Sequence, residues 1–579
     1  MTKICASVII EAVLSGERTV ISVGKYALGL DFGTLSVRAL IVEMRTGREI
    51  ADEVCAYAHG CMEEALPSGV PLGVDWALQH PDDYIAAMTG AVRGVLRKSG
   101  VDGDEVAGIG VDFTSCTVLP ALNDGTPLCD LPEYRDEPHA YVKLWMHHAA
   151  AREAAEIERI GSVHAKKWMD RYSGSMSSES FFPKLLQIVR EAPEVYARAD
   201  LFLEAGDWLV WRMTGRLCRN SCAAGYKAMW HAEDGYPGRD FFRALDPRME
   251  NVVAEKLRGE IVPIGSVAGY LTEEIAGELG LRAGTPVAAC VVDAHCAFAG
   301  LGVDGPGTLM LSMGTSCCHL TIHDREVDVP GMCGNVWGGI LPGFYGYEAG
   351  QAGFGTHFSW FAENGVPAAY RDEAAAKGQT ALEFLAERAR KLRPGENGII
   401  ALDWWNGNRS ILNDQNLSGA LIGLTSQSRP EDIYRALLEG VIFGTRRIVE
   451  SFEDAGVPIS RIVAVGGIPR KNPLLMQICA DILGKPILLA ESSQGAALGA
   501  AVFGAVAAGG ANGGYDDVLE AVRRMGKCGD VVYTPDSRNH AAYEAIYQDY
   551  RMLYDWFGAQ PLMARMKARR RGCLEAAQE

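Results

Sequence analysis

The sequence feature that most constrains the fold is a strand–turn–strand unit that occurs twice, about 280 residues apart. In the first unit, an apolar segment over residues 26–31 ends on Asp31, and a second β-rich segment spans residues 37–43. In the later unit, the two segments span residues 308–313 and 317–322. β-rich segments joined by a short Gly-containing turn are typical of hairpins. A repeat over this distance predicts a duplicated domain architecture rather than a solenoid.

Both turns combine glycine with hydroxyl side chains. Glycine lets backbone N–H groups approach an anion closely, and hydroxyls add further donors, which is the chemistry of a phosphate site. An ordinary hairpin turn is the alternative for either turn alone, but two turns in equivalent places favour phosphate binding. Asp31, before the first turn, could hold Mg²⁺ through water. The turn residues are Gly33 and Thr34 in the first unit and Gly314, Thr315 and Ser316 in the second.

Three further apolar segments resemble buried parallel strands. They span residues 106–112, 286–293 and 461–467, and the last ends in Gly466-Gly467. Helices are expected to follow at 294–302, 472–483 and 494–501, the last rich in small residues suited to close packing. Strands that alternate with helices predict an α/β fold, in which active sites lie at the carboxyl ends of strands.

Single residues at these places have two interpretations each. Asp293 follows a strand and precedes a helix, so it is either a helix N-cap, which its position alone favours, or a general base; the two roles are compatible. The Gly466-Gly467 pair is either a tight turn or a surface for an adenosine. Lys227 and Glu348 lie among small and aromatic residues, and each is either a surface charge or a hydroxyl-binding group.

Composition excludes several classes of protein. Asp and Glu (73) outnumber Lys and Arg (55), giving a net charge of −18, and the charges are spread along the chain, which argues against a nucleic-acid partner. No apolar run reaches the ~18 residues of a membrane span. Fifteen cysteines without a C-x-x-C pair indicate free thiols in a reducing cytosol. No Cys/His cluster has the spacing of a zinc site. Residues 1–24 are interpreted as an extension outside the fold, and a cytoplasmic location is expected.

Taken together, these segments resemble the FGGY carbohydrate kinases, from about residue 25 to 555. The C-terminal part of the resemblance rests on residues 398–409, 419–424 and 432–439. The resemblance implies a two-lobed actin-like ATPase (ribonuclease H-like) fold with duplicated lobes and a central cleft. The implied units are an extension (1–24), an N-terminal lobe (25–303), a C-terminal lobe (304–555) and a tail (556–579), with a hinge near 303–307.

Within the family, the chain is most similar to the members that phosphorylate L-ribulose. The segments that carry this similarity are 29–40, 76–81, 110–115, 224–230, 331–334 and 346–351. The similarity implies transfer of the γ-phosphoryl group of Mg²⁺-ATP to the 5-hydroxyl of L-ribulose, in arabinose breakdown. Asp293 would accept the hydroxyl proton, and Lys227 and Glu348 would bind the sugar with Ser115 as a neighbour.

The same resemblance assigns Gly466, Gly467 and Asn472 to the ATP side of the cleft. The expected partner is a small ketopentose, with no nucleic acid or membrane, and a homodimer is plausible. The alternatives are a kinase for another ketopentose or polyol, such as D-ribulose, xylulose or glycerol, and more remotely an actin-like ATPase that is not a kinase.

Overall fold

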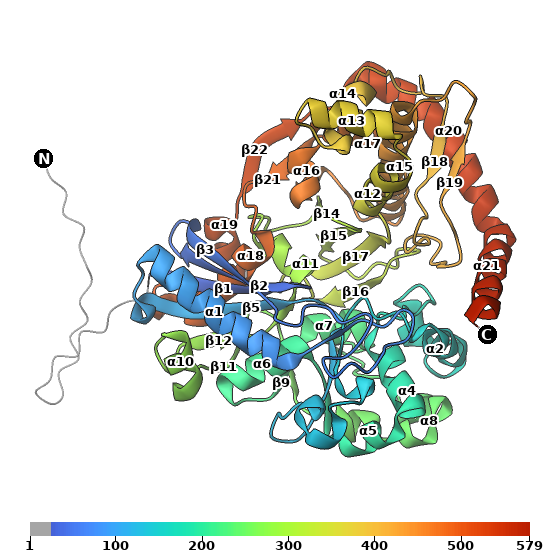
Figure 1. Ribbon diagram of the computed structural model, residues 1–579. Coiled ribbons are helices and arrows are strands. Elements are labelled where there is room, and N and C mark those ends of the chain that lie inside the picture. The colour runs from blue at the N-terminus through green and yellow to red at the C-terminus, as the bar shows by residue number, and fades with distance from the viewer. Residues whose placement is uncertain (1–24, 579) are drawn as a thin grey trace, which may run out of the picture.

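Two lobes, each built on a β-sheet, make up the part of the chain that the computed structural model describes, residues 25–578 (Figure 1). The N-terminal sheet has the strand order β11-β12-β5-β1-β2-β3, and β13 also pairs with β5. Its strands are β1 (Tyr26–Phe32), β2 (Ser36–Glu43), β3 (Arg48–Ala56), β5 (Val106–Phe113), β11 (Val267–Tyr270), β12 (Pro286–Ala288) and β13 (Val291–Val292). The predicted extension, residues 1–24, lies outside the described residues.

The C-terminal sheet has the order β16-β17-β15-β14-β20-β21-β22. Its strands are β14 (Thr308–Met313), β15 (Cys317–His323), β16 (Gly334–Trp337), β17 (Tyr345–Gln351), β20 (Arg461–Val465), β21 (Ile487–Ala490) and β22 (Cys528–Tyr533). In both sheets an antiparallel hairpin, β1–β2 or β14–β15, pairs along its first strand with a parallel strand, β5 or β20. The predicted duplication is therefore confirmed.

The segment expected to be one strand over residues 286–293 is divided into β12 and β13. The helix that follows, α11 (Asp293–Ala299), begins at Asp293, and Val292 occupies the N-cap position. The N-cap interpretation of Asp293 was therefore wrong. Its Oδ1 instead accepts the backbone N–H of Ala294 at 2.6 Å, and the other carboxylate oxygen is not used by this bond.

Helix α18 (Gly495–Ala508) connects the C-terminal part of the chain to the N-terminal sheet. It packs on β5, β1 and α11, and its small residues allow backbone contact, as expected for this segment. A Cβ atom on Gly110 would lie 1.8 Å from the carbonyl oxygen of Ala500, and one on Gly29 would lie 1.9 Å from that of Ala497. Because α18 crosses to the other lobe, the expected hinge near 303–307 is one of several connections between the lobes.

Helices cover the outer faces of both sheets (Figure 1). In the N-terminal lobe, α1 (Pro81–Ser99) packs on β2 and β3 and ends at Gly100 in the left-handed conformation. In the C-terminal lobe, α15 (Pro430–Asp454) packs on α17 (Pro473–Leu483). Helix α20 (Ser537–Ala559) buries Tyr543, Tyr547, Tyr550 and Tyr554, whose spacing places them on one helix face.

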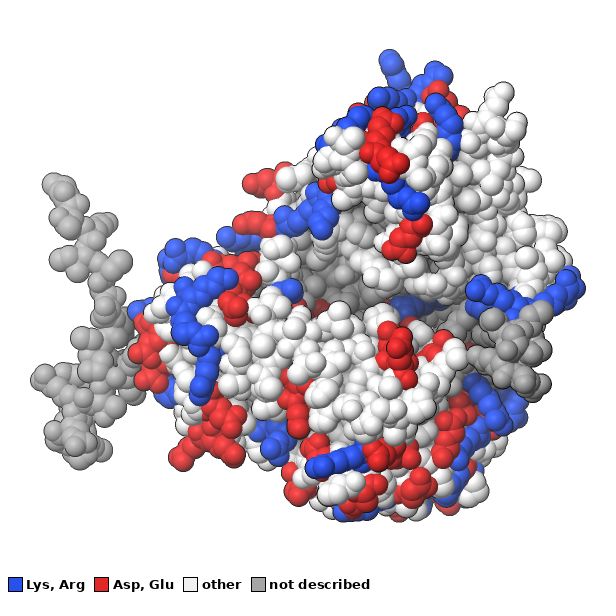
Figure 2. Space-filling model, viewed as in Figure 1, with Lys and Arg blue, Asp and Glu red and all other residues white. Residues whose placement is uncertain are grey.

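Beyond α20, α21 (Leu562–Gln578) forms part of the segment that was expected to be a tail. Among the helices of the described chain, none is both long and apolar enough to cross a membrane. The surface view shows a hollow between the two lobes, and acidic and basic side chains are interspersed over the visible outer face (Figure 2).

Candidate active site

Both predicted phosphate turns are closed by a backbone hydrogen bond from their glycine, and the first turn is one residue longer. In the first, the N–H of Gly33 donates to the carbonyl of Ser36 at 3.0 Å; in the second, the N–H of Gly314 donates to the carbonyl of Ser316 at 2.9 Å. The first turn is further held through Thr34, whose hydroxyl accepts from the Trp145 indole N–H at 3.2 Å. The carbonyl of Thr34 accepts from the side chain of Gln79 at 2.7 Å. Both turns are thus fixed at the ends of hairpins.

Residues at the start of α12 (Gly355–Asn364) support the second turn. The N–H of Phe354 donates to the carbonyl of Thr315 at 2.8 Å, and the N–H of Gly355 donates to that of Gly314 at 3.0 Å. A Cβ atom on Gly355 would lie 2.7 Å from the same Gly314 oxygen, so only glycine fits without a shift. These bonds occupy carbonyl oxygens of the turn and do not use its N–H donors.

The predicted adenosine surface lies next to this turn. Gly466 has φ 109°, and a Cβ atom there would lie 2.6 Å from the carbonyl oxygen of Met313, the last residue of β14. A Cβ atom on Gly467, the first residue of α16 (Gly467–Lys471), would meet no atom within 4 Å. The turn is therefore packed on one side and open on the other, as a ligand surface requires.

Asn472, which the sequence assigned to the ATP side, makes two structural bonds. Its Oδ1 accepts from the N–H of Leu475 at 3.0 Å, as the N-cap of α17, and its Nδ2 donates to the Tyr434 hydroxyl at 3.1 Å. The helix was expected to begin at Asn472, but this residue is the N-cap and α17 begins at Pro473. Its contact with ATP remains a prediction.

Three carboxylates meet at the carboxyl ends of the N-terminal strands. Asp31 of β1 lies opposite Asp112 of the parallel strand β5, and Val291, two residues before Asp293, pairs with Asp112 from the other side. Asp31 accepts an ion-paired hydrogen bond from Arg38 at 2.9 Å. The sequence placed Asp112, like Asp31, at the carboxyl end of an apolar strand, where active sites lie, but assigned it no specific role. The apolar strand that ends on an aspartate in both cases was the signal that could have identified it.

The pKa values of all three carboxyl groups are raised above their usual range. Burial and the neighbouring Asp31 raise the pKa of Asp293 to about 7. Burial also raises the pKa of Asp31, although Arg38 opposes this effect. The pKa of Asp112 is raised furthest, first by burial and then by the charges of Asp31 and Asp293. Carboxyl groups that are buried together and face mainly one another disfavour ionisation.

This group of carboxylates fits a divalent cation. Both oxygens of Asp112 are buried and receive no hydrogen bond from an N–H or hydroxyl group of the described residues, so the neighbouring carboxyl group of Asp31 is their polar contact. Carboxylate oxygens are the ligands that Mg²⁺ prefers, usually with several waters retained. A cation here would favour the ionised form of these carboxyl groups, which Arg38 favours only at Asp31.

Lys227 and Glu348 form a buried ion pair between the lobes, close enough to Asp293 to affect its pKa. Lys227 ends α7 (Ser221–Lys227), Glu348 lies on β17, and the Lys227 Nζ is 2.9 Å from both carboxylate oxygens. His295 Nε2 lies 3.2 Å from the same carboxylate. Burial would raise the pKa of Glu348, but Lys227 and His295 hold it well below its usual range. Neither residue is the surface charge of the simpler interpretation.

Ser115 lies in the loop after β5, and its contact with the sugar stays a prediction. Its carbonyl accepts from the Thr117 hydroxyl at 3.3 Å. The following residue, Cys116, has φ 55°, and its carbonyl accepts from the buried Lys184 ammonium at 2.5 Å. Lys184 also donates to the carbonyl of Leu144 at 2.7 Å. The ammonium group of Lys184 thus holds the loop that carries Ser115 in place.

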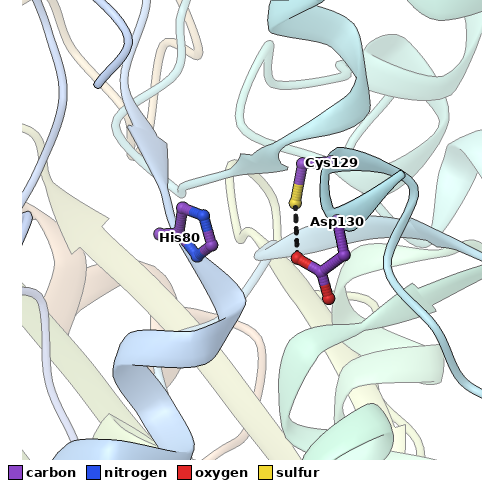
Figure 3. A group of neighbouring side chains, drawn as sticks. All are labelled: His80, Cys129 and Asp130. Atoms are coloured by element: carbon purple, nitrogen blue, oxygen red, sulfur yellow. Dashed lines mark hydrogen bonds between the residues drawn. The ribbon is translucent and has the colours of Figure 1, made fainter. Parts of the chain in front are cut away.

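One cluster of potential metal ligands was not expected from the sequence. His80, Cys129 and Asp130 offer ligand atoms within 4.8 Å of one another, and Figure 3 shows the imidazole ring facing the other two side chains. However, His80 Nδ1 accepts the N–H of Asp82 at 3.3 Å as the cap of α1, so in the neutral ring Nε2 carries the proton. Burial raises the pKa of the Cys129 thiol well above its usual range. These features indicate a structural cluster.

Comparison with known proteins agrees with this geometry. Residues 26–300 match the N-terminal domain of the FGGY family of carbohydrate kinases, and residues 309–508 match its C-terminal domain. The chain is 51% identical over 547 residues to a ribulokinase of Halalkalibacterium halodurans, covering 94% of this chain and 97% of the relative. It is 46% identical over 550 residues to a ribulokinase of Mycolicibacterium smegmatis, covering 94% and 96%.

Solved structures share the fold. The xylulose kinase of Rhodospirillum rubrum superposes with a TM-score of 0.75 at 21% identity, covering 93% of this chain and 99% of that chain. The glycerol kinase of Plasmodium falciparum with ADP superposes with a TM-score of 0.70 at 16% identity, covering 92% and 98%. The two duplicated lobes, the paired turns and the matches over both domains lead to one conclusion: the chain belongs to the FGGY family of carbohydrate kinases.

Proposed function

We propose that the protein transfers the γ-phosphoryl group of ATP to the 5-hydroxyl of L-ribulose, giving L-ribulose 5-phosphate and ADP. The single observation that carries this proposal is that Asp293 is electrostatically coupled both to Asp31, which precedes the first predicted phosphate turn, and to the Lys227–Glu348 pair. Sequence relatives that are named ribulokinases and are 46–51% identical over nearly the whole chain support the choice of sugar.

Asp293 is the proposed general base. In the reaction, its carboxylate takes the proton of the 5-hydroxyl while the sugar oxygen bonds to the γ-phosphorus and the bond from that phosphorus to the ADP oxygen breaks. A base is most effective when its pKa is near the working pH, and the pKa of Asp293 is raised to about 7. Phosphoryl transfer otherwise depends on positioning and on charge stabilisation.

Lys227 and Glu348 are the proposed sugar-binding pair, with Ser115 beside them. An ammonium donates hydrogen bonds and a carboxylate accepts them, so together they can bind neighbouring hydroxyls of a ketopentose in a fixed orientation. In the described structure these two groups bond to each other. Sugar hydroxyls would replace those bonds without changing the net charge of the pocket.

The turns with Gly33, Thr34, Gly314, Thr315 and Ser316 are proposed to bind the ATP phosphates, and Gly466 and Gly467 to border the adenosine. Asp31, with Asp112 beside it, would hold Mg²⁺ through water molecules, several of which this ion usually retains. When bound, Mg²⁺ neutralises phosphate charge during transfer. The chain's own part is to fix both substrates and keep water from the γ-phosphate.

The decisive experiment is a coupled ADP-release assay with Mg²⁺-ATP and a panel of acceptors. The panel contains L-ribulose, D-ribulose, both xyluloses, glycerol and a control without sugar. Turnover that depends on L-ribulose, with kcat/KM well above that of the other acceptors, is expected. A preference for another acceptor would retain the fold and the base but reject the proposed sugar, and hydrolysis that ignores every sugar would reject the kinase assignment for this pocket.

A further inference from the structure

A second, largely buried ion pair connects the two lobes. Glu179 lies in the N-terminal lobe, two residues before α4 (Phe181–Glu191), and Arg409 lies in the C-terminal lobe, in the segment after β18 (Ile400–Leu402). The Arg409 Nη2 donates to both carboxylate oxygens of Glu179, at 2.7 and 2.9 Å. The two side chains are only 22% and 18% exposed. Arg409 ends the 398–409 segment that resembles the family, but the sequence assigned no role to either residue.

On the C-terminal side, this pair is connected to the strand that carries Glu348. A Cβ atom on Gly350 would lie 2.9 Å from Arg409 Cδ, so the arginine stem rests directly on this part of β17. The adjacent Ser410 hydroxyl accepts the N–H of Gly350 at 3.2 Å. Glu348 is two residues away and points to the same face of the sheet as Gly350. The segment of residues 409–410 therefore fixes β17 next to the sugar-binding carboxylate.

On the N-terminal side, Glu179 shares the electrostatic environment of Lys227. Burial alone would raise the pKa of Glu179, but Arg409 and then His148 and Lys227 lower it below its usual range. Arg409 in turn has its pKa raised, first by Glu179. Both members of the pair therefore stay charged, and each depends on the other because an unpaired buried charge is costly.

We propose that the Glu179–Arg409 pair is a latch between the lobes that positions Glu348 against Lys227 when the cleft closes on the sugar. This inference rests on the proposed sugar-binding role of Lys227 and Glu348. Those two groups cannot hold the lobes together while their hydrogen bonds are transferred to sugar hydroxyls. Glu179 and Arg409 bond to each other and not to the proposed sugar, so they maintain closure during that exchange. They are positioning residues and take no part in proton transfer.

The test is a double-mutant cycle with Glu179→Gln, Arg409→Gln and the double variant. Each single variant leaves one buried charge unpaired in the closed state, so the KM for L-ribulose is expected to rise about 10- to 100-fold, as for a misplaced reacting group. The KM for ATP is expected to change less than threefold, because the phosphate turns are not touched. The double variant is expected to be less impaired than the product of the two single effects.

A matched control and a conservative variant accompany the cycle. Glu373→Gln removes an ion pair with Arg388 within the C-terminal lobe, in which Glu373 is 45% and Arg388 32% exposed. The KM values for L-ribulose and ATP are expected to stay at their wild-type values in this variant. Arg409→Lys retains the positive charge but loses the planar guanidinium group that contacts both carboxylate oxygens of Glu179. A KM for L-ribulose between those of the wild type and Arg409→Gln is therefore expected. Thermal melting shows which variants are folded. If a Gln variant is not folded, the KM values of Arg409→Lys are used in its place.

A second readout does not depend on turnover. Without substrates, the single variants are expected to have a larger radius of gyration in X-ray scattering than the wild type and Glu373→Gln, because the closed state has lost a bond. An unchanged KM for L-ribulose, an equal rise in both KM values, or additive effects in the cycle would overturn the latch. If the wild type does not use L-ribulose, the proposed function fails, and unchanged scattering would then independently reject the latch.

Discussion

Replacing Asp293 by asparagine tests the active site through stability as well as activity. Burial and Asp31 raise the pKa of Asp293 from 3.8 to about 7. An acid whose pKa is higher in the folded than in the unfolded state binds its proton more tightly when folded, so the protein loses stability as pH rises between those two values. By this linkage, the carboxyl group costs ~2 kcal/mol of folding free energy at pH 5 and ~4 kcal/mol at pH 8.

Asp293→Asn removes this cost. The variant is therefore expected to be more stable than the wild type, with a stability gain about 2 kcal/mol larger at pH 8 than at pH 5. At the same time it loses the proton acceptor, so kcat is expected to fall about 10²- to 10⁴-fold, with small changes in both KM values. In the wild type, kcat/KM for L-ribulose is expected to fall about tenfold per pH unit below pH 7, and the variant should lack this dependence.

Denaturant unfolding at pH 5 and pH 8 and ADP release between pH 5 and pH 9 measure these effects. Glu373→Gln, which removes an exposed carboxylate outside the proposed site, controls for a general effect of charge. Near-wild-type kcat in Asp293→Asn would refute the base assignment. A stability gain that is the same at both pH values would refute the electrostatic reasoning, whatever the effect on kcat.

Three further substitutions test other parts of the site and the fold. Lys227→Met is expected to raise the KM for L-ribulose at least tenfold and the KM for ATP less than twofold, as steady-state kinetics would measure; an unchanged sugar KM would exclude direct contact. Asp112→Asn is expected to raise the Mg²⁺ concentration at half-maximal rate and to weaken Mn²⁺ binding followed by electron paramagnetic resonance. Unchanged Mn²⁺ binding would remove Asp112 from the metal site. Gly110→Ala places a methyl group 1.8 Å from a carbonyl oxygen of α18 and is expected to lower the unfolding free energy in urea by ~3 kcal/mol; a change within 0.5 kcal/mol would show that the helix can move away.

The hairpins and the fold class could be predicted because their signals are local. Residues 26–43 and 308–323 each carry their strands and their turn within one short stretch, and Asp31 and Asp293 follow apolar strands directly. The division of the 286–293 segment into two strands could not be predicted. The break between β12 and β13 depends on how each pairs with β5, and not on the hydrophobic pattern. The N-cap role expected for Asp293 was wrong because α11 begins one residue earlier than expected, at Asp293 itself.

Contacts between distant segments account for the rest. Lys227 was recognised as a polar group in an apolar context, but its bond to Glu348 joins residues 121 positions apart, and the Glu179–Arg409 pair spans 230 positions. Periodicity and turn chemistry contain no information on such pairs. The docking of α18 on the other lobe was likewise visible only as a run of small residues, which indicates close packing but not against which element.

The two ends of the cleft differ in how their charge is balanced, and this difference matches the two substrates. At the phosphate end, the carboxyl groups of Asp31, Asp112 and Asp293 lie close enough to raise one another's pKa values, and Arg38 pairs with Asp31. A ligand that brings a cation would favour the ionised form of these groups. At the sugar end, Lys227 is paired with Glu348, and Arg409 with Glu179. A neutral sugar can replace hydrogen bonds there but brings no charge, and a pocket with unpaired charges would bind it poorly. The paired end therefore suits a neutral polyhydroxy substrate, and the unpaired end suits a metal-bound nucleotide.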